Sequence, residues 1–281
     1  MRFMRIGEVG AERPAIVDEA GVARDLSAIV PDIGPDTIAG LGDRLAGVDP
    51  KDLPILPTEG QRIGAPIARP RNIWCIGLNY SDHAAESGMP VPSEPIVFSK
   101  PGSALCGPND PILTSPGMTK IDWEVELGIV IGAPALDLAP GTAMDHVFGY
   151  VAANDVSERA WQMERGGQWM KGKSYPNFCP CGPWLVTRDD IPDPQTLGME
   201  LSVNGAVMQK GTTATMIFGV AHIVEYLSQF ALLEPGDLIV TGTPPGVGMG
   251  QKPPRYLAHG DVVELSIDGL GAQRSEVRPR V

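Results

Sequence analysis

Basic residues are scarce in this sequence. Its 281 residues include 22 Lys and Arg against 34 Asp and Glu, which gives a formal net charge of −12 at pH 7. A charge of this sign repels phosphate backbones, and no stretch of the chain offers a basic stripe. Nucleic acid is therefore not an expected partner.

Long hydrophobic runs are also missing. No segment approaches the roughly 20 consecutive apolar residues that cross a bilayer. The first residues, "MRFMRIGEVGAERPA", lack the apolar stretch of a secretory signal. We therefore expect a cytoplasmic protein with no membrane partner.

Cysteine is rare, with four in the chain. The only close pair, Cys179 and Cys181 in "CPC", lacks the two-residue gap of common zinc and redox motifs. Reduced, packed thiols are expected rather than disulfides or structural zinc.

Glycine and proline, by contrast, are abundant, at 34 and 28 residues. From Asn72 onward they separate short β-type runs such as "NIWCIGLN", "PIVFSK" and "VFGYVAAND", a spacing typical of a sandwich, barrel or roll rather than a doubly wound sheet. A Pro-rich linker near residues 52–72 divides a small N-terminal β-rich domain, residues 1–68, from a larger domain, residues 69–281. The expected fold is mostly β with a few helices (α+β).

Helical periodicity is clearest in "TMIFGVAHIVEYLSQF", residues 215–230. The apolar residues that this spacing places on one face are Ile217, Val220, Ala221, Val224 and Leu227. A shorter helix is expected to begin near Ser81, with Gly88 as its stop signal.

Acidic residues alternate in "KIDWEVELGIVIG", residues 120–132. On a strand, Glu124 and Glu126 share one face, close enough for both to bind one cation. The alternative is the solvated face of an edge strand. Gly128 and Val130 continue the same face, which counts against a solvated one.

A third carboxylate, Asp155, ends an apolar run in "GYVAANDVSERAWQ". Three carboxylates without a neighbouring His or Cys favour a hard divalent ion, Mg²⁺ or else Mn²⁺ or Ca²⁺. Their excess negative charge calls for a cation nearby, and Lys173 is the candidate, with Gly172 beside it to allow close backbone approach. The alternative for Lys173 is a solvated surface charge.

Five separated motifs resemble the fumarylacetoacetate hydrolase (FAH) family in order and spacing, over Asn72 to about Leu270. They are "GLNYSDHAAE", "DWEVELGIVIG", "NDVSERAWQ", "KGKSYPNFCPCGPWLVT" and "GDLIVTGTPPGVG". The segments "QKGTTATMIFG" and "MGQKPPRYLAHGDVVELSIDGLGAQR" are most like the family's bacterial 2,4-diketo-3-deoxy-L-rhamnonate or L-fuconate hydrolases.

The resemblance implies a β-roll or sandwich core of the FAH type and assigns roles to nine residues. The implied roles are metal ligands for Glu124, Glu126 and Asp155, catalysis for His83, Glu86 and Lys173, and substrate binding for Arg159, Gln162 and Thr243. Pro176 and Asn177 depart from the Asp-Thr that is common in the family, which leaves the shape of that loop open.

The implied activity is Mg²⁺-dependent hydrolysis of a carbon–carbon bond in a 2,4-diketo acid, giving pyruvate and a small acid such as L-lactate. Alternatives on the same fold are acylpyruvate or fumarylpyruvate hydrolysis, oxaloacetate decarboxylation and ureidoglycolate cleavage. A non-catalytic, metal-dependent keto-acid binding protein is the alternative outside enzymes. The resemblance also implies that the protein is a homodimer. The small molecules it is expected to bind are diketo-acid substrates.

Overall fold

The computed structural model describes residues 1–87 and 90–280, and within them the fold is mostly β with a few short helices, as expected. The larger of its two main sheets is mixed and ten-stranded. Its path runs through β3 (Ala23–Asp25), β2 (Arg13–Val17), β1 (Arg2–Ile6), β14 (Leu185–Thr187), β11 (Val147–Asn154), β10 (Val125–Ile131), β17 (Leu238–Val240), β5 (Ile73–Gly77) and β6 (Ile96–Lys100), with β4 (Ile63–Gly64) also paired to β1.

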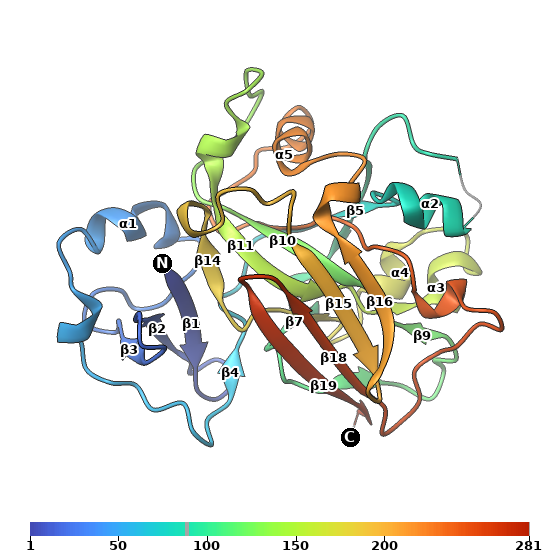
Figure 1. The fold of residues 1–281 in the computed structure, drawn as a ribbon, viewed down its shortest axis with the longest axis horizontal. Helices are drawn as coiled ribbons and strands as arrows, with labels where there is room; N and C mark the ends of the chain where they lie inside the picture. The colour runs from blue at the N-terminus through green and yellow to red at the C-terminus, as the bar shows by residue number, and fades with distance from the viewer. Residues whose placement is uncertain (88–89, 281) are drawn as a thin grey trace.

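The second main sheet has five strands and lies in front of β10 and β11 in Figure 1, where β10 contacts β15 and β18. Its strands, in order, are β16 (Ala206–Thr212), β15 (Gly198–Val203), β18 (Val262–Ile267), β19 (Gly271–Pro279) and β8 (Ile112–Thr114). Apolar residues of both sheets form one continuous core. The architecture is therefore a sandwich, one of the alternatives that the sequence left open.

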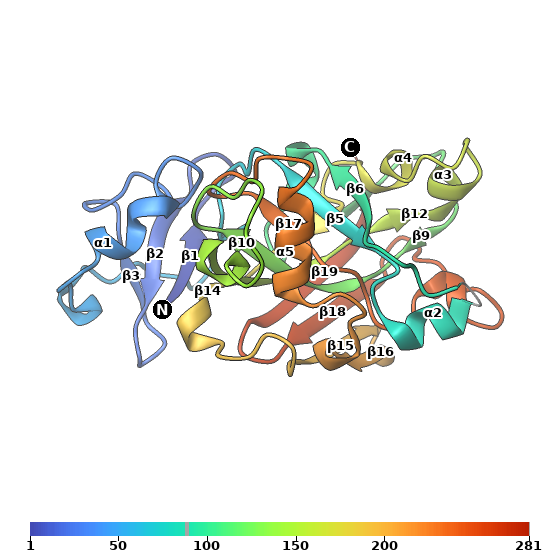
Figure 2. The same cartoon turned by 90° about the horizontal axis from the view of Figure 1, so that it is seen from above.

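The helices and two short ladders surround these sheets. The helices are α1 (Leu41–Arg44), α2 (Ser81–Ser87), α3 (Arg159–Met163), α4 (Met170–Lys173) and α5 (Val220–Ser228). The ladders are β9 (Ile121–Asp122) with β12 (Ser157–Glu158), and β7 (Leu105–Cys106) with β13 (Cys179–Pro180). Helices α2, α3 and α4 gather at the end of the molecule opposite β1–β3 (Figure 1), whereas α5 lies over β17 and β10 (Figure 2).

The N-terminal unit shares both its sheet and its core with the rest of the chain. Strand β1 pairs with β14, with Phe3 opposite Leu185. Phe3 and Ile33 are fully buried in the same core as the strands of the larger unit. The sheet thus continues across the boundary expected at residue 68, and whether residues 1–68 fold as a separate domain stays a prediction.

The long helix is shorter than the sequence predicted, because α5 begins at Val220 rather than at residue 215. Asn79 holds the preceding residues outside the helix: Ile217 N donates to the Asn79 backbone oxygen at 2.8 Å, and Phe218 N donates to Asn79 Oδ1 at 2.8 Å. Ile217 therefore lies outside the helix. Within it, Ile223 is buried in place of Ala221, which is exposed.

The shorter helix begins at Ser81, as expected, whereas its predicted stop at Gly88 lies outside the described residues. None of the described helices has the length and apolar character needed to cross a bilayer. All four cysteines are buried and free, in agreement with packed thiols.

Candidate active site

Strand β10 contains Glu126 and begins directly after Glu124, and both carboxylates lie inside the molecule. It lies between β11 and β17, and the two residues are 6% and 2% exposed. Gly128 continues their face, and a Cβ there would lie 2.5 Å from Val151 Cγ2. The face is therefore tightly packed, and the alternative of a solvated edge strand is wrong.

The backbone around Glu124 is held by side chains rather than by a regular ladder. Glu124 N donates to Asn154 Oδ1 at 3.1 Å, and Val125 N donates to Gln209 Oε1 at 3.0 Å. Glu124 thus sits in the gap between β9 and β10. At this break between the strands, the Asn154 and Gln209 side chains supply the hydrogen bonds that the backbone amides of Glu124 and Val125 need.

Asp155 follows directly after β11, and its amide donates to the Glu124 backbone oxygen at 2.9 Å. One carboxylate oxygen from each of Glu124, Glu126 and Asp155 lies within 4.8 Å of the others, and all three residues are buried. Three clustered carboxylates suit a hard divalent cation such as Mg²⁺ or Mn²⁺. The donor set therefore fits the ion that the sequence predicted.

Two buried cations bind these carboxylates. Lys173 Nζ lies 2.6 Å from Glu124 Oε2 and 2.7 Å from Asp155 Oδ2, and Arg159 Nη2 lies 2.7 Å from Glu124 Oε1. Lys173 is 2% exposed, so the alternative of a solvated surface lysine is wrong. Gly172 is needed beside it, because a Cβ there would lie 2.4 Å from the Glu158 backbone oxygen.

Two charged residues of this cluster had no role in the sequence-based prediction. Buried Lys100, at the end of β6, contacts Asp155 Oδ1. Buried Asp122 accepts from Arg159 Nε at 2.8 Å and from Gly248 N at 2.6 Å. The available signals were the alternation of Lys100 with Phe98 along one strand face, and of Asp122 with Glu124.

The pKa values of Glu124 and Glu126 are shifted in opposite directions by their surroundings. Burial alone would raise the pKa of Glu124, but the charges of Arg159 and Lys173 lower it to about 2. Burial, and then the charges of Asp155 and Glu124, raise the pKa of Glu126 well above its usual range. Without a divalent ion, therefore, Glu126 holds a proton to a higher pH than Glu124 does.

Helix α2 brings His83 and Glu86 together one turn apart. His83 Nδ1 lies 3.2 Å from Glu86 Oε2, and Gly246 N donates to both Glu86 oxygens at 3.2 Å. The His83 side chain is 12% exposed and that of Glu86 27%. The pair predicted from the sequence is formed, and Gly246 ties it to the loop after β17.

Most of these groups meet in one cavity of about 70 Å³, whose described lining does not include Glu86, Lys100 or Asp122. Its polar floor, as we name it, consists of His83, Glu124, Glu126, Asp155, Arg159, Gln162, Lys173 and Thr243. Its apolar wall consists of Ile76, Leu78, Phe98, Met163, Trp169 and Met249. Trp169 packs edge-on against Phe98 and so closely over Gly77 that a Cβ there would lie 2.3 Å from the indole ring.

The two predicted substrate-binding groups besides Arg159 also have protein partners. Gln162 Oε1 accepts from Arg159 Nη1 at 3.0 Å. The Thr243 hydroxyl donates to the Val125 backbone oxygen at 2.9 Å and accepts from Gln209 Nε2 at 2.8 Å. The Thr243 hydroxyl already donates its hydrogen bond to Val125. A substrate carboxylate could accept that hydrogen bond only in place of the Val125 oxygen.

The loop with Pro176 and Asn177 has a defined shape. Asn177 adopts a φ of 62°, a left-handed conformation that asparagine tolerates, and its Nδ2 donates to the Pro111 backbone oxygen at 2.9 Å. The departure from the family pattern therefore fastens this loop to the segment before β8.

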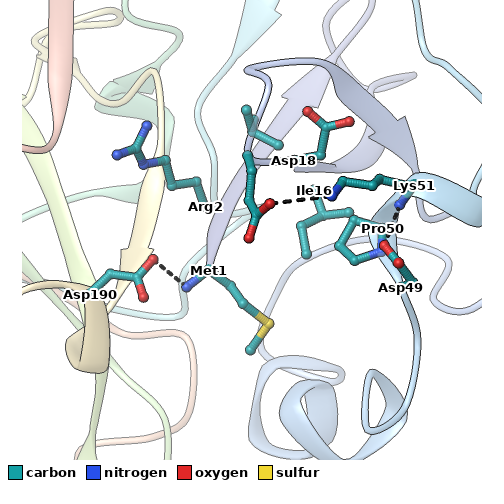
Figure 3. A pocket seen from close by; sticks show the side chains of 10 residues that line it. Met1, Arg2, Ile16, Asp18, Asp49, Pro50, Lys51 and Asp190 are labelled. Carbon is teal, nitrogen blue, oxygen red and sulfur yellow. Dashed lines mark hydrogen bonds and ion pairs between the residues drawn. The ribbon is translucent and has the colours of Figure 1, made fainter.

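A larger hollow, of about 540 Å³, lies beside the N-terminal unit (Figure 3). Two ion pairs lie along it: the Met1 ammonium lies 2.6 Å from Asp190, and Lys51 Nζ lies 3.3 Å from Glu19. In contrast to the polar floor, these pairs are exposed to solvent. The smaller cavity is therefore the candidate active site.

Comparison with known proteins agrees with this geometry. A family model described as fumarylacetoacetate (FAA) hydrolase C-terminal matches residues 72–278. A Burkholderia multivorans protein whose name assigns it provisionally to the hydrolases is 55% identical over 275 residues, which cover 97% of each chain.

Two solved structures are similar over the full length of both chains. A fumarylacetoacetate hydrolase from psychrophilic Exiguobacterium antarcticum aligns with a TM-score of 0.88 and 39% identity, covering 100% of each chain. A maleylpyruvate hydrolase from Sphingobium sp. SYK-6, in complex with manganese(II) and pyruvate, aligns with a TM-score of 0.81 and 29% identity, again covering 100% of each. On its sequence and its fold, this chain belongs to the fumarylacetoacetate hydrolase family.

Proposed function

We propose that the protein is a divalent-metal-dependent hydrolase that cleaves the C3–C4 bond of a 2,4-diketo acid and releases pyruvate. The observation that carries this proposal is the convergence of three carboxylates, Lys173 and His83 on one buried cavity. The manganese and pyruvate held by the related maleylpyruvate hydrolase support it.

The charges of the cluster favour a monoanionic chelating substrate. Four buried carboxylates (Asp122, Glu124, Glu126 and Asp155) face three buried cations (Lys100, Arg159 and Lys173), which leaves one excess negative charge when all are ionised. A divalent ion would reverse that excess to one positive charge. A single keto-acid carboxylate would then neutralise the site.

A bound divalent ion would supply Lewis-acid polarisation of the substrate's keto-acid end. Lys173 would add positive charge where the enolate of pyruvate develops. His83 would accept a proton from the water that attacks C4, with Glu86 orienting its ring and stabilising the imidazolium. As the C3–C4 bond breaks, its electron pair passes to the enolate, which is then protonated, while C4 leaves as a carboxylic acid.

The apolar wall favours one kind of acyl group. Phe98, Trp169, Met163 and Met249 offer hydrophobic contact opposite the polar floor. An alkyl or aromatic acyl group, as in an acylpyruvate, suits that wall better than the hydroxylated chain of a deoxy sugar acid, whose hydroxyls would lose hydrogen bonds to water. Acylpyruvate hydrolysis is therefore the second candidate beside the sugar-acid reaction.

The test is a pyruvate-release assay with Mg²⁺ or Mn²⁺ over acylpyruvates, fumarylpyruvate, oxaloacetate and 2,4-diketo-3-deoxy sugar acids, with ureidoglycolate cleavage followed separately. We expect EDTA-sensitive turnover that is fastest with a diketo acid. Metal-dependent binding of these acids without turnover of any of them would instead identify a binding protein. Faster ureidoglycolate cleavage or oxaloacetate decarboxylation would contradict the proposed reaction.

A further inference from the structure

Lys100 is a buried cation without direct access to the cavity. It ends β6, its side chain is fully buried, and it is absent from the described residues that line the cavity. Its backbone is fixed by pairing with Ile73 of β5. A lysine buried this completely requires specific partners, because an unpaired ammonium inside a protein is costly.

Its partners lie on the far side of Asp155. Lys100 Nζ contacts Asp155 Oδ1 and donates to the Val156 backbone oxygen at 3.2 Å. The other carboxylate oxygen, Asp155 Oδ2, lies 2.7 Å from Lys173 Nζ. The two lysines therefore bind opposite oxygens, which fixes the rotation of the carboxylate and directs Oδ2 towards Glu124.

The two lysines differ in what else they can reach. Lys173 lines the cavity and contacts Glu124 as well as Asp155, so it can respond to a ligand. Among the described residues, Lys100 Nζ hydrogen-bonds to Asp155 and Val156, which directly follow β11. Orientation of a metal ligand by a neighbouring hydrogen-bond partner is a general way in which proteins raise metal affinity.

We propose that Lys100 is a positioning residue for the divalent-cation site, which holds Asp155 in the orientation that completes the three-carboxylate set without touching substrate. This inference rests on the metal-dependent function proposed above. It assigns to Lys100 an effect on metal affinity, distinct from the role of Lys173 beside the substrate.

The test measures Mn²⁺ binding directly, without substrate, by calorimetry and by the EPR signal of free Mn²⁺ at constant pH. We compare the wild type, Lys100→Met, which removes the charge at similar length, and Lys120→Met as the matched control. Lys120 forms an ion pair with Glu164 at the surface. We expect Lys100→Met to weaken Mn²⁺ binding by roughly 10- to 100-fold and Lys120→Met to leave it unchanged.

Circular dichroism and thermal unfolding separate this effect from a loss of fold. If Lys100→Met does not fold, Lys100→Gln, which keeps a hydrogen-bond donor for Val156, takes its place. A folded variant with lower thermal stability but wild-type Mn²⁺ affinity would show that Lys100 only stabilises the core, and would overturn the proposal. Mn²⁺ binding by the wild type without pyruvate release would contradict the proposed function alone.

Discussion

Glu124 and Glu126 lie two residues apart and line the same cavity, yet their surroundings shift their pKa values in opposite directions. Glu124 has two cationic partners, whereas the Glu126 carboxylate accepts a hydrogen bond from the uncharged Gly242 N, at 2.7 Å. A neutral residue should therefore replace Glu126 with little loss of stability in the absence of metal. At Glu124, the same change would leave Arg159 and Lys173 without a buried partner.

The first prediction concerns Glu126→Gln. The pKa of Glu126 is raised by burial and by the charges of Asp155 and Glu124, so the folded metal-free protein keeps this proton to a higher pH than the unfolded chain. The free energy of unfolding should fall as pH rises from about 4.5 towards the folded pKa, by at most about 1.4 kcal/mol per pH unit. Urea unfolding in EDTA from pH 5 to 8 should show this fall in the free energy of unfolding for the wild type and not for Glu126→Gln.

Added Mn²⁺ provides the control for that measurement. It should stabilise the wild type increasingly as pH rises, because binding requires the ionised carboxylate. It should stabilise Glu126→Gln much less. Parallel pH profiles for the two proteins in EDTA would contradict the assignment of the proton to Glu126.

The second prediction concerns His83 as the base that activates water. His83→Ala should lower kcat for diketo-acid hydrolysis by roughly 10²- to 10⁴-fold, with a much smaller change in the affinity for the non-cleavable analogue oxalate. Glu86→Gln should have an intermediate effect, since an amide oxygen can still hold the ring but cannot stabilise imidazolium. The measurements are steady-state kinetics and calorimetry.

Two controls accompany this test. His222→Ala changes an exposed histidine on α5 and should leave kcat unaltered. Any oxaloacetate decarboxylation needs no attacking water and should suffer less than hydrolysis in His83→Ala. Equal losses of both activities would mean that α2 acts only as a cover, and that the base lies elsewhere.

At the scale of elements, the contact between α3 and α4 decides where Lys173 lies. A Cβ at Gly172 would lie 2.6 Å from Gln162 N and 2.4 Å from the Glu158 oxygen, so Gly172→Ala must push the two helices apart. We predict a loss of about 1–3 kcal/mol in the free energy of unfolding, together with weaker Mn²⁺ binding. Gly42→Ala, in α1, is the matched control, because nothing lies within 4 Å of its added Cβ. Equal melting temperatures for the two variants would refute this packing argument.

The positions of strands and helices could be predicted from the sequence more accurately than the neighbours that pack against them. Alternation predicts a strand through Glu124 and Glu126, whereas the structure interrupts that strand at Glu124. The choice between a solvated face and a ligand face depends on β11 and β17, whose positions local pattern cannot supply. The start of α5 was missed for a similar reason. Asn79, far away in the sequence, binds the amides of Ile217 and Phe218 and overrides their helical periodicity.

The candidate site shows the same limit. The three clustered carboxylates and Lys173 were predicted from motifs, whereas Lys100 and Asp122 are distinguished only by the partners that the fold brings near. Asp122, for example, binds Gly248 N and Met249 N, more than a hundred residues further along the chain. Such contacts have no signature in a single sequence beyond a charged residue in an apolar strand.

At the scale of the whole molecule, the two units should depend on each other. Arg62 joins them through ion pairs of 2.8 Å to Glu12 and 2.6 Å to Asp110, and β1 pairs with β14 in one sheet. We predict that residues 69–281 alone will not give a folded soluble protein, because β14 would lose a partner strand and the core would lose Phe3. Circular dichroism and size-exclusion chromatography check this, and a monodisperse truncated protein with wild-type thermal stability would contradict it.

The subunit number is a separate prediction at this scale. We expect a homodimer in which strands of the larger unit supply much of the contact. Sedimentation at micromolar concentration should then give twice the 29.8 kDa mass of one chain. A species of 29.8 kDa alone would count against the dimer.

The division of the cavity into a polar floor and an apolar wall has a consequence for protein engineering. Five residues of the floor, Glu124, Asp155, Arg159, Gln162 and Lys173, are bound to one another, so a change at one of them disturbs several others. Ile76, Leu78, Met163 and Met249 lie on the wall and take part in none of the ion pairs described for the floor. A library confined to these four positions should redirect the choice of acyl group while the catalytic apparatus stays intact.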